Sequence, residues 1–395
     1  MDQNKARSLL REGAILVLLD VPEGTEMGID LKVWNTEENF RGFKMIPPGL
    51  HFIFYSCVSK TEDIAPRRGF FHNFKKSEFL VKKWNKGKED LCLEEVDNKE
   101  VVGLKDNYIA LDKFLGPYPF EIHKRWSALI SHITTKVLDR HNPIQGKIMS
   151  AIELIPCSDA DRPRGIKKTA NLDSAGCSSS SSSDSNTTVN YTNATKRSRL
   201  SCPSDLEQIL LPNLKPVPGS ELRFTPFPSK VFPEGCTPSE ITKHCLDLTY
   251  TLENMLTSYD EPSEIIGELQ FCYVCFLVGH SLEAFEQWKK LVGLLCSCET
   301  AIKKYRQVFD LFVTVLEAQL REIPEEFLAD IVANSNYIYV KLKNFFGVVE
   351  ESDIDGRLKT KIDRFKNSIK NFLKWDFSFT EREDDDDAPV IVETT

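Results

Sequence analysis

Four cysteines are the first residues whose spacing suggests chemistry. Cys272 and Cys275 form a CxxC pair, and Cys296 and Cys298 form a CxC pair. A structural zinc site needs about four converging ligands, whereas both pairs fall in long apolar stretches that we expect to be helical. A redox CxxC belongs at a helix N-terminus, where the dipole lowers the thiol pKa; this pair lies inside the expected helix. We therefore predict thiols that fill a core, with no metal site and no redox role.

A second candidate is the string Gly279-His280-Ser281-Leu282-Glu283, which is similar to a nucleophile elbow. Glu283 stands where the elbow has its last glycine, and a helix precedes the string instead of a strand. We predict a turn between two helices, with Ser281 capping the second.

Other catalytic patterns are absent from the sequence. It contains no glycine-rich phosphate loop and no metalloprotease pair, and the acidic run Glu381 to Asp387 lacks the glycine and the spacing of a calcium loop. An enzyme would have to use an unrecognised pocket with Glu268 or His280 as acid or base. We favour Glu268 as a first-turn partner of the helix dipole and His280 as a turn residue. The sequence predicts no catalytic residue, no cofactor and no enzyme activity.

Composition limits the class of protein. The chain has 395 residues, 41% of them hydrophobic and 28% charged, with a formal net charge of -9 and 11 cysteines. Two domains are expected at this length, and the negative charge disfavours a broad nucleic-acid-binding face. The start, MDQNKARSLLREG, does not have the pattern of a signal peptide, and no apolar stretch is long enough to span a membrane. We expect reduced thiols in a cytosolic or nuclear protein.

Residues 1–155 are predicted to form a β-rich domain. Asp2 to Glu12 suggests a short helix that ends at Gly13, and Ala14 to Leu19 a buried strand. Phe43 to Ile46 and Leu50 to Val58 suggest a strand pair around Pro47-Pro48-Gly49. Both alternating faces of the second strand are largely apolar.

The same domain is predicted to continue with two strands and two helices. The strands cover Phe70 to Phe74 and Phe79 to Trp84. Apolar residues at helical spacing then predict one helix from Val101 to Leu115, closed by Gly116-Pro117, and another from Ile122 to Val137. The domain therefore reads as a β-sandwich-like fold with packed helices.

Residues 156–220 are predicted to be a disordered linker. Serines, prolines and polar residues dominate the segment, so it cannot bury enough apolar surface to offset chain entropy. Its one basic cluster, Lys196-Arg197-Ser198-Arg199, is either solvated charge, which we favour, or a nuclear import signal.

Residues 221–379 are predicted to form an all-α bundle. Thr237-Pro238-Ser239-Glu240 is a capping box with proline at the first helical position, and one helix is expected from there to Leu256. Nearly every position from Ile265 to Val278 is apolar, with Gln270 a rare exception, so we expect this stretch to be a buried central helix. Further helices are predicted over Ile302 to Leu316, from Pro324 through Phe327 and Ile331, and over Leu358 to Phe372.

Residues 380–395 are predicted to form a solvated acidic spacer followed by an extended peptide. Ala388 to Glu393 is β-branched and apolar.

Several long strings resemble one known family, the Aar-two splicing factors. They are FRGFKMIPPGLHFIFYS, DKFLGPYPF, FPEGCTPSEITKHCLDLTYTLE and GELQFCYVCFLVGHSLEAFEQWKKL, and the tail is similar at Lys374 to Phe377 and Ala388 to Glu393. The linker has no counterpart in this resemblance. The resemblance implies an α+β chain with a β-sandwich-like N-terminal domain and a VHS-like helical C-terminal domain.

The resemblance also implies a function. Such proteins act as assembly chaperones that hold the Prp-eight scaffold, through its RNase H-like and Jab/MPN-like domains, in the immature U-five small nuclear ribonucleoprotein. They exclude the Brr-two helicase until maturation. For this chain it implies a role in pre-mRNA splicing as a monomer, with RNA involved only indirectly and no membrane.

Two segments are candidate functional sites. We expect Val390, Ile391, Val392 and Glu393 to add as a β-strand to an exposed sheet edge of the partner; the alternative is a tail that folds back on the chain's own N-terminal sheet. Phosphorylation of the serine tract would loosen a complex through added charge, against the simpler interpretation of a solvated spacer. The tract consists of Ser178, Ser179, Ser180, Ser181, Ser182 and Ser183. A helical, peptide-binding trafficking adaptor is a competing function.

Overall fold

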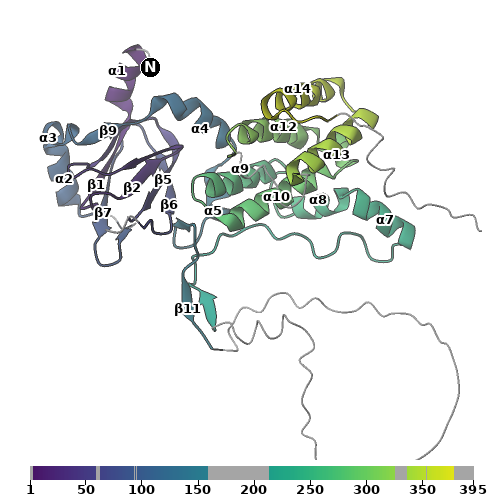
Figure 1. Cartoon of the computed structure of the whole chain (residues 1–395), viewed down its shortest axis with the longest axis horizontal. Coiled ribbons are helices and arrows are strands. Elements are labelled where there is room, and N and C mark those ends of the chain that lie inside the picture. Colours follow the sequence, from purple (N-terminus) through teal and green to yellow (C-terminus); the bar gives the residue numbers. More distant parts are fainter. Residues whose placement is uncertain are drawn as a thin grey trace, which may run out of the picture. The chain divides into compact units, whose positions relative to one another are not determined.

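The computed structural model describes residues 3–58, 63–92, 94, 96–158, 213–324, 336–352 and 354–377. Its chain divides into two compact units: one joins Met1–Ala151 to Gly219–Thr395, and the other is Ile152–Pro218. The first unit holds β-sheets in its N-terminal part and helices in its C-terminal part (Figure 1), which confirms the α+β fold class. We call the described residues up to 151 the sheet region and those from 219 to 377 the helical region.

Two five-stranded sheets make up the sheet region. The first has the strand order β8-β7-β1-β4-β9, and the second has the order β10-β6-β5-β2-β3. In the first sheet β1 runs parallel to β7 and β4 runs parallel to β9, whereas neighbouring strands of the second sheet run antiparallel. The strands are β1 (Ala14–Leu19), β2 (Glu26–Ile29), β3 (Lys32–Asn35), β4 (Gly42–Ile46), β5 (Gly49–Ser56), β6 (Arg68–Phe74), β7 (Phe79–Asn85), β8 (Asp90–Leu91), β9 (Leu115–Pro117) and β10 (Ile148–Met149).

The predicted pairing of β4 with β5 is wrong. The two strands belong to different sheets, so Pro47-Pro48-Gly49 carries the chain from one sheet to the other instead of closing a hairpin. One hairpin that the sequence did not reveal is β2–β3, because each of its strands has only four residues. Its turn contains Asp30, which has a positive φ of 55°.

Strand β5 contacts a different core with each face. Ile53 and Tyr55 pack inside the sheet region, whereas Phe52 and Phe54 belong to the core of the helical region. The prediction that both faces are apolar is therefore explained, because helices cover the outer face of the second sheet.

The predicted helices of the sheet region are broken up. Residues 101–115 form α2 (Asn98–Asp106), α3 (Tyr108–Asp112) and the start of β9 instead of one helix. Residues 122–137 form a 3-10 turn, η1 (Phe120–Ile122), then α4 (His123–Leu129) and α5 (Thr135–His141). The last break occurs where Thr134 caps α5 by accepting a hydrogen bond from Val137 N. The N-terminal helix α1 (Gln3–Glu12) agrees with the prediction.

The helical region is built around α9 (Glu264–Leu277), whose residues from Ile265 to Phe276 are all buried. This confirms the predicted central helix. The remaining helices are α7 (Pro238–Leu246), α8 (Thr249–Leu256), α10 (Leu282–Cys296), α11 (Ala301–Lys304), α12 (Arg306–Leu320), α13 (Tyr337–Glu351) and α14 (Gly356–Leu373). The capping box at Thr237 is present, with both of its hydrogen bonds. The helix predicted from Pro324 through Ile331 lies largely outside the described residues.

The single helix predicted from Ile241 to Leu256 is two helices, and Asp247 explains the break. Its carboxylate accepts hydrogen bonds from the backbone N–H of Thr249 at 3.0 Å and of Glu299 at 2.9 Å. An aspartate that binds nearby backbone groups in this way competes with helix formation. Burial opposes the ionised form, but hydrogen bonds from Thr249 and Thr300 hold the pKa of Asp247 below its ordinary value.

The ends of the predicted linker are ordered. Strand β11 (Leu154–Pro156) pairs antiparallel with β12 (Leu214–Pro216). The serine tract, the basic cluster and the C-terminal tail lie outside the described residues. Among the helices that are described, none is long and apolar enough to cross a membrane.

Candidate functional site

The structure describes the candidate acid–base residues and thiols, but not the tail strand Val390 to Glu393 or the serines Ser178 to Ser183. Those two segments stay predictions.

All four paired cysteines are buried free thiols. Cys272 and Cys275 face the core from inside α9, and Cys296 and Cys298 lie at the end of α10. Burial raises the pKa of each thiol, so each stays protonated and unreactive at neutral pH. Within the described part of the chain, no group of three or more His, Cys, Asp or Glu side chains is placed to hold a metal ion.

The string that is similar to a nucleophile elbow is the turn between α9 and α10, as predicted. Ser281 caps α10 by accepting a hydrogen bond from Ala284 N at 3.3 Å, and His280 has a φ of 57°. Arg67, from the sheet region, donates to Val278 O at 3.1 Å and to His280 Nε2 at 2.9 Å. Because an arginine side chain can only donate, His280 Nε2 accepts this hydrogen bond. His280 therefore helps to join the α9–α10 turn to the sheet region.

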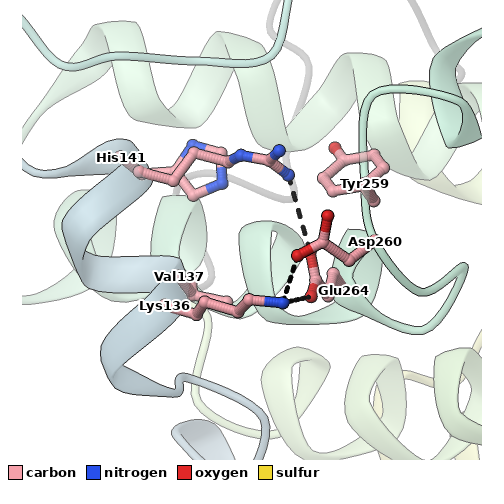
Figure 2. A pocket seen from close by; sticks show the side chains of 7 residues that line it. Lys136, Val137, His141, Tyr259, Asp260 and Glu264 are labelled. Carbon is pink, nitrogen blue, oxygen red and sulfur yellow. Dashed lines mark hydrogen bonds and ion pairs between the residues drawn. The ribbon is translucent and has the colours of Figure 1, made fainter.

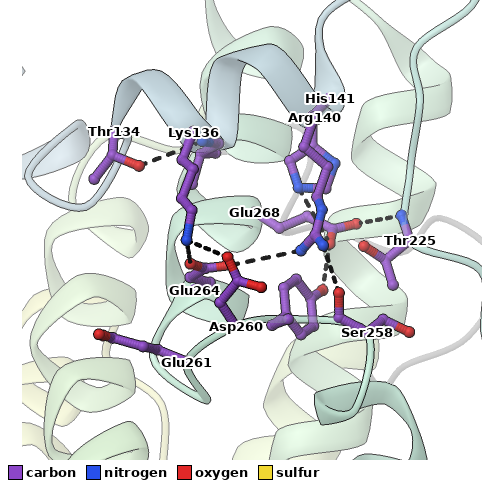
Figure 3. A network of polar contacts seen from close by, with 12 residues as sticks. Thr134, Lys136, Arg140, His141, Thr225, Ser258, Asp260, Glu261, Glu264 and Glu268 are labelled. Atoms are coloured by element: carbon purple, nitrogen blue, oxygen red, sulfur yellow. Dashed lines mark hydrogen bonds and ion pairs between the residues drawn. The ribbon is translucent and has the colours of Figure 1, made fainter.

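Glu268 lies at the centre of a buried hydrogen-bond network (Figure 3). The residue has no solvent exposure. Its Oε1 accepts from Thr225 N at 3.0 Å and from Gln287 Nε2 at 3.2 Å, and its Oε2 accepts from the Tyr259 hydroxyl. Burial and the nearby Glu268 charge raise the pKa of Tyr259, so this hydroxyl remains a donor. The interpretation of Glu268 as a first-turn residue is wrong, because α9 begins at Glu264.

His141, from the sheet region, lies beside this network. Its Nε2 lies 3.6 Å from Glu268 Oε2, and its Nδ1 lies 2.8 Å from Arg223 O. A carbonyl oxygen can only accept, so Nδ1 carries a proton. Burial lowers the pKa of His141 despite the nearby Glu268. The neutral imidazole therefore joins the end of α5 to residues 222–227, a segment that we call the strap.

The strap is fastened to α5 by backbone and side-chain contacts. Arg223 N donates to His141 O at 3.0 Å, and Arg223 Nε donates to Asn142 O at 2.6 Å. Leu222, Phe224 and Phe227 pack against the core of the helical region. The strap therefore connects both regions of the first unit.

A small pocket of about 70 Å³ is lined by His141 and Tyr259 together with charged residues of α5 and of the start of α9 (Figure 2). Lys136 points its ammonium group at Asp260 and at Glu264 Oε1, the latter 3.1 Å away. Arg140 lies 3.6 Å from Glu264 Oε2 and 5.0 Å from the ring of Tyr259. The charges around the pocket are paired with one another, and Glu268 is covered by its own donors. The arrangement can hold α5 against α9, and it offers no unpaired acid or base to a substrate.

A third set of contacts joins α9 to the α4–α5 turn. Gln270, a polar residue in the largely apolar α9, accepts from His132 N at 2.6 Å and donates to Ala128 O at 2.9 Å. Gly267 permits this approach, because a Cβ there would lie 2.6 Å from His132 O. The sequence marked Gln270 as an exception in an apolar run, but nothing in it identified the partners of Gln270 or the role of Gly267.

The sequence reading also missed a buried network in the sheet region. Asp30 Oδ2 lies 2.7 Å from His51 Nδ1 and accepts from the Tyr118 hydroxyl at 2.6 Å. Asp30 Oδ1 accepts from Phe52 N at 3.0 Å, and His51 Nε2 lies 2.8 Å from Pro47 O. Each polar atom is used within the fold, so this network holds the β2–β3 turn against β5.

Comparison with known proteins covers both regions. The family model for the AAR2 N-terminal domain matches residues 12–143, and the model for the AAR2 C-terminal repeat region matches residues 224–378. The human "Protein AAR2 homolog" is 36% identical over 398 residues, covering 100% of this chain and 97% of its own. The Caenorhabditis elegans "Protein AAR2 homolog" is 35% identical over 371 residues, covering 94% of this chain and 96% of its own.

A more distant relative carries a functional name. The Saccharomyces cerevisiae "A1 cistron-splicing factor AAR2" is 25% identical over 165 residues, covering 40% of this chain and 45% of its own. Full-length similarity to the human protein and the two matched domains lead to one conclusion: the chain belongs to the AAR2 family.

Proposed function

We propose that this chain is a non-catalytic pre-mRNA splicing factor that chaperones assembly of the U-five small nuclear ribonucleoprotein. It binds the RNase H-like and Jab/MPN-like domains of the Prp-eight scaffold and excludes the Brr-two helicase until maturation. The observation that carries this proposal is family membership together with the yeast relative, whose name is a splicing factor.

The buried networks support a non-catalytic role. An acid or base must reach its substrate to transfer a proton, whereas Glu268 has no solvent exposure and each of its oxygens accepts a hydrogen bond. The four paired thiols are buried and protonated.

The shared core supports a role as a binding platform. Phe52 and Phe54 of the sheet region and the buried apolar residues of α9 belong to one hydrophobic cluster, so both regions pack on a common core. We include in the proposal that the helical region is VHS-like and that the protein is a monomer. We also propose that it meets RNA only indirectly and works in the cytoplasm and nucleus.

The C-terminal tail supplies the proposed second contact. Val390 to Glu393 would add a strand to a sheet edge of the scaffold. About four backbone hydrogen bonds at about 1 kcal/mol each give only about millimolar affinity. The tail therefore works together with the folded surface, which raises its effective concentration.

The decisive experiment is titration of the full chain with the purified RNase H-like fragment of the scaffold, measured by calorimetry. We expect a stoichiometric complex. Deleting Ala388 to Thr395 weakens it measurably, whereas deleting only Thr394 and Thr395 leaves affinity unchanged. Absence of a complex with the full chain contradicts the proposal, and unchanged affinity after the longer deletion contradicts the role of the tail alone.

Regulation by the serine tract is a separate part of the proposal. Phosphorylation adds about -1.5 to -2 charges at each serine. Replacement of Ser178 to Ser183 by aspartate is expected to speed release of the scaffold fragment, and replacement by alanine is the matched control. Equal release rates for the two variants contradict this mechanism.

A further inference from the structure

We propose that the groove between strands β3 and β9 binds an extended, uncharged apolar segment of another protein, which adds to β3 as a further strand of the second sheet. We call this surface the edge groove. It has a volume of about 600 Å³, and its walls include the aromatic side chains of Trp34, Phe40, Phe43 and Phe114. The proposal stands independently of the splicing function proposed above.

Strand β3 is an open edge. It is the last strand of the second sheet and pairs with β2, through Met27 with Trp34 and Gly28 with Val33. All four of its residues are exposed, including Val33 at 44% and Trp34 at 37%. Within the described residues no strand pairs with its other side. An edge that combines unpaired backbone groups with exposed apolar side chains is a template for a further strand.

The groove lies on the side to which such a strand would point its side chains. Lys32 and Trp34 of β3, which are two residues apart and share a face, both line it. The ring centroid of Phe43 lies 5.5 Å from that of Trp34 and 5.3 Å from that of Phe40. Strand β9, the edge of the first sheet, forms the opposite wall through Leu115–Pro117. Every second residue of an added strand would therefore enter an aromatic slot.

Charge selects the chemistry of the occupant. The charged residues that line the groove are Lys32 and Lys113 against Glu37 and Glu121. Two positive and two negative groups give no net charge, so neither a nucleic acid nor an acidic or basic peptide gains from the field. An extended peptide satisfies the open backbone groups of β3, which a helix cannot do.

The groove is also preformed. Tyr118 in its wall is fixed by the hydrogen bond to Asp30, the residue that sets the β2–β3 turn. A rigid wall lowers the entropy cost of binding a peptide.

The test is selection of peptides about seven residues long from a displayed random library on the full-length protein, followed by fluorescence anisotropy with the selected peptides. We expect peptides without net charge that carry apolar residues at alternate positions. Trp34→Ala should weaken their binding by about tenfold or more. Phe372→Ala, which removes an aromatic side chain that is 48% exposed on α14, is the matched control and should leave binding unchanged.

Two further measurements keep the result independent of variant folding. Methylation of alternate backbone nitrogens on one edge of a selected peptide should abolish binding to the wild-type protein, because those N–H groups pair with β3. Removal of Ala388 to Thr395 should not change peptide affinity. The proposal is overturned if no peptide is enriched, or if binding survives both Trp34→Ala and methylation. It is also overturned if removal of the tail raises affinity about tenfold or more, because the chain's own tail would then be the occupant.

Discussion

The two regions of the first unit each bury one carboxylate, and the two are used differently. Asp30 and Glu268 both have no solvent exposure. Each accepts a hydrogen bond from a tyrosine hydroxyl and lies near a histidine. His51 stands 2.7 Å from Asp30, whereas His141 stands 3.6 Å from Glu268. The partners of Asp30 all belong to the sheet region. The donors to Glu268 come from the strap, from α10 and from the α8–α9 turn, and His141 beside it binds the strap to α5.

The two carboxylates therefore stabilise different parts of the fold. The Asp30 network sets one turn within a sandwich, whereas the Glu268 network fastens the sheet region to the helical region. We therefore expect the two regions to respond differently to the loss of their carboxylates, although each loss leaves buried donors without acceptors.

The largest effect is expected from Glu268→Ala and Asp30→Ala, each of which should lower the free energy of unfolding by about 3–5 kcal/mol. Hydrogen exchange distinguishes them: Glu268→Ala should deprotect the strap and α5, and Asp30→Ala should deprotect β2 and β5. Chemical denaturation measures the loss, with Glu268→Gln as a milder control that keeps the shape. Identical exchange patterns in the two alanine variants would show that both carboxylates serve one cooperative unit.

The close approach of α9 to the α4–α5 turn gives the next effect. Gly267→Ala places a methyl group 2.6 Å from His132 O and 2.7 Å from Val137 Cγ2. We expect a loss of about 1–3 kcal/mol in thermal or chemical unfolding. The matched control is Gly103→Ala in α2, where nothing lies within 4 Å of the added methyl group, so about 0.4–1 kcal/mol is gained. An unchanged free energy of unfolding for Gly267→Ala would contradict this expectation, because α9 and the α4–α5 turn would then move apart at no cost.

Acid should weaken the connection made by His141. Its pKa is lowered by burial from an ordinary value of 6.5, so below about that pH the unfolded chain binds a proton that the folded chain does not. Stability is then lost as the pH falls, at about 1.4 kcal/mol per pH unit for each such proton. His141→Asn should flatten the dependence of unfolding free energy on pH by that share. An unchanged slope contradicts the assignment of a neutral imidazole.

The smallest effect is expected at the rim of the pocket. Lys136 is exposed and pairs with Asp260 and Glu264 at the surface, and water and salt screen such pairs. Lys136→Ala should leave the melting temperature unchanged within error. A clear drop in melting temperature would show that the surface ion pairs, and not the buried network, hold α5 in place.

Local patterns predicted most elements but not their partners. The all-apolar run that became α9, the capping box at Thr237 and strand β1 each follow from residues that are neighbours in the sequence. The pairing of β9 with β4, in contrast, joins Leu115 to Gly42, and a three-residue strand carries no pattern of its own. Apolar spacing also continued through the breaks at Thr134 and Asp247, where a side-chain oxygen accepts a hydrogen bond from the first turn of the next helix without changing the period.

The candidate site shows the same limit. Glu268 and Gln270 stand out as polar residues in an apolar helix, which is a signal that they have buried partners. Those partners are Thr225 and Gln287 for one residue and the α4–α5 turn for the other. They come from distant parts of the chain, so only the fold identifies them. The edge groove was missed because β3 was missed.

The ladder between β11 and β12 has a practical consequence. Leu154 stands opposite Pro216, and Pro156 stands opposite Leu214. The part of the chain that joins β11 to β12 therefore begins and ends at adjacent positions. Closing a loop costs only about 0.6 kcal/mol more for each doubling of its length. Evolution can therefore lengthen or shorten this part of the gene at little thermodynamic expense, and a reporter domain inserted there would leave the rest of the protein able to fold.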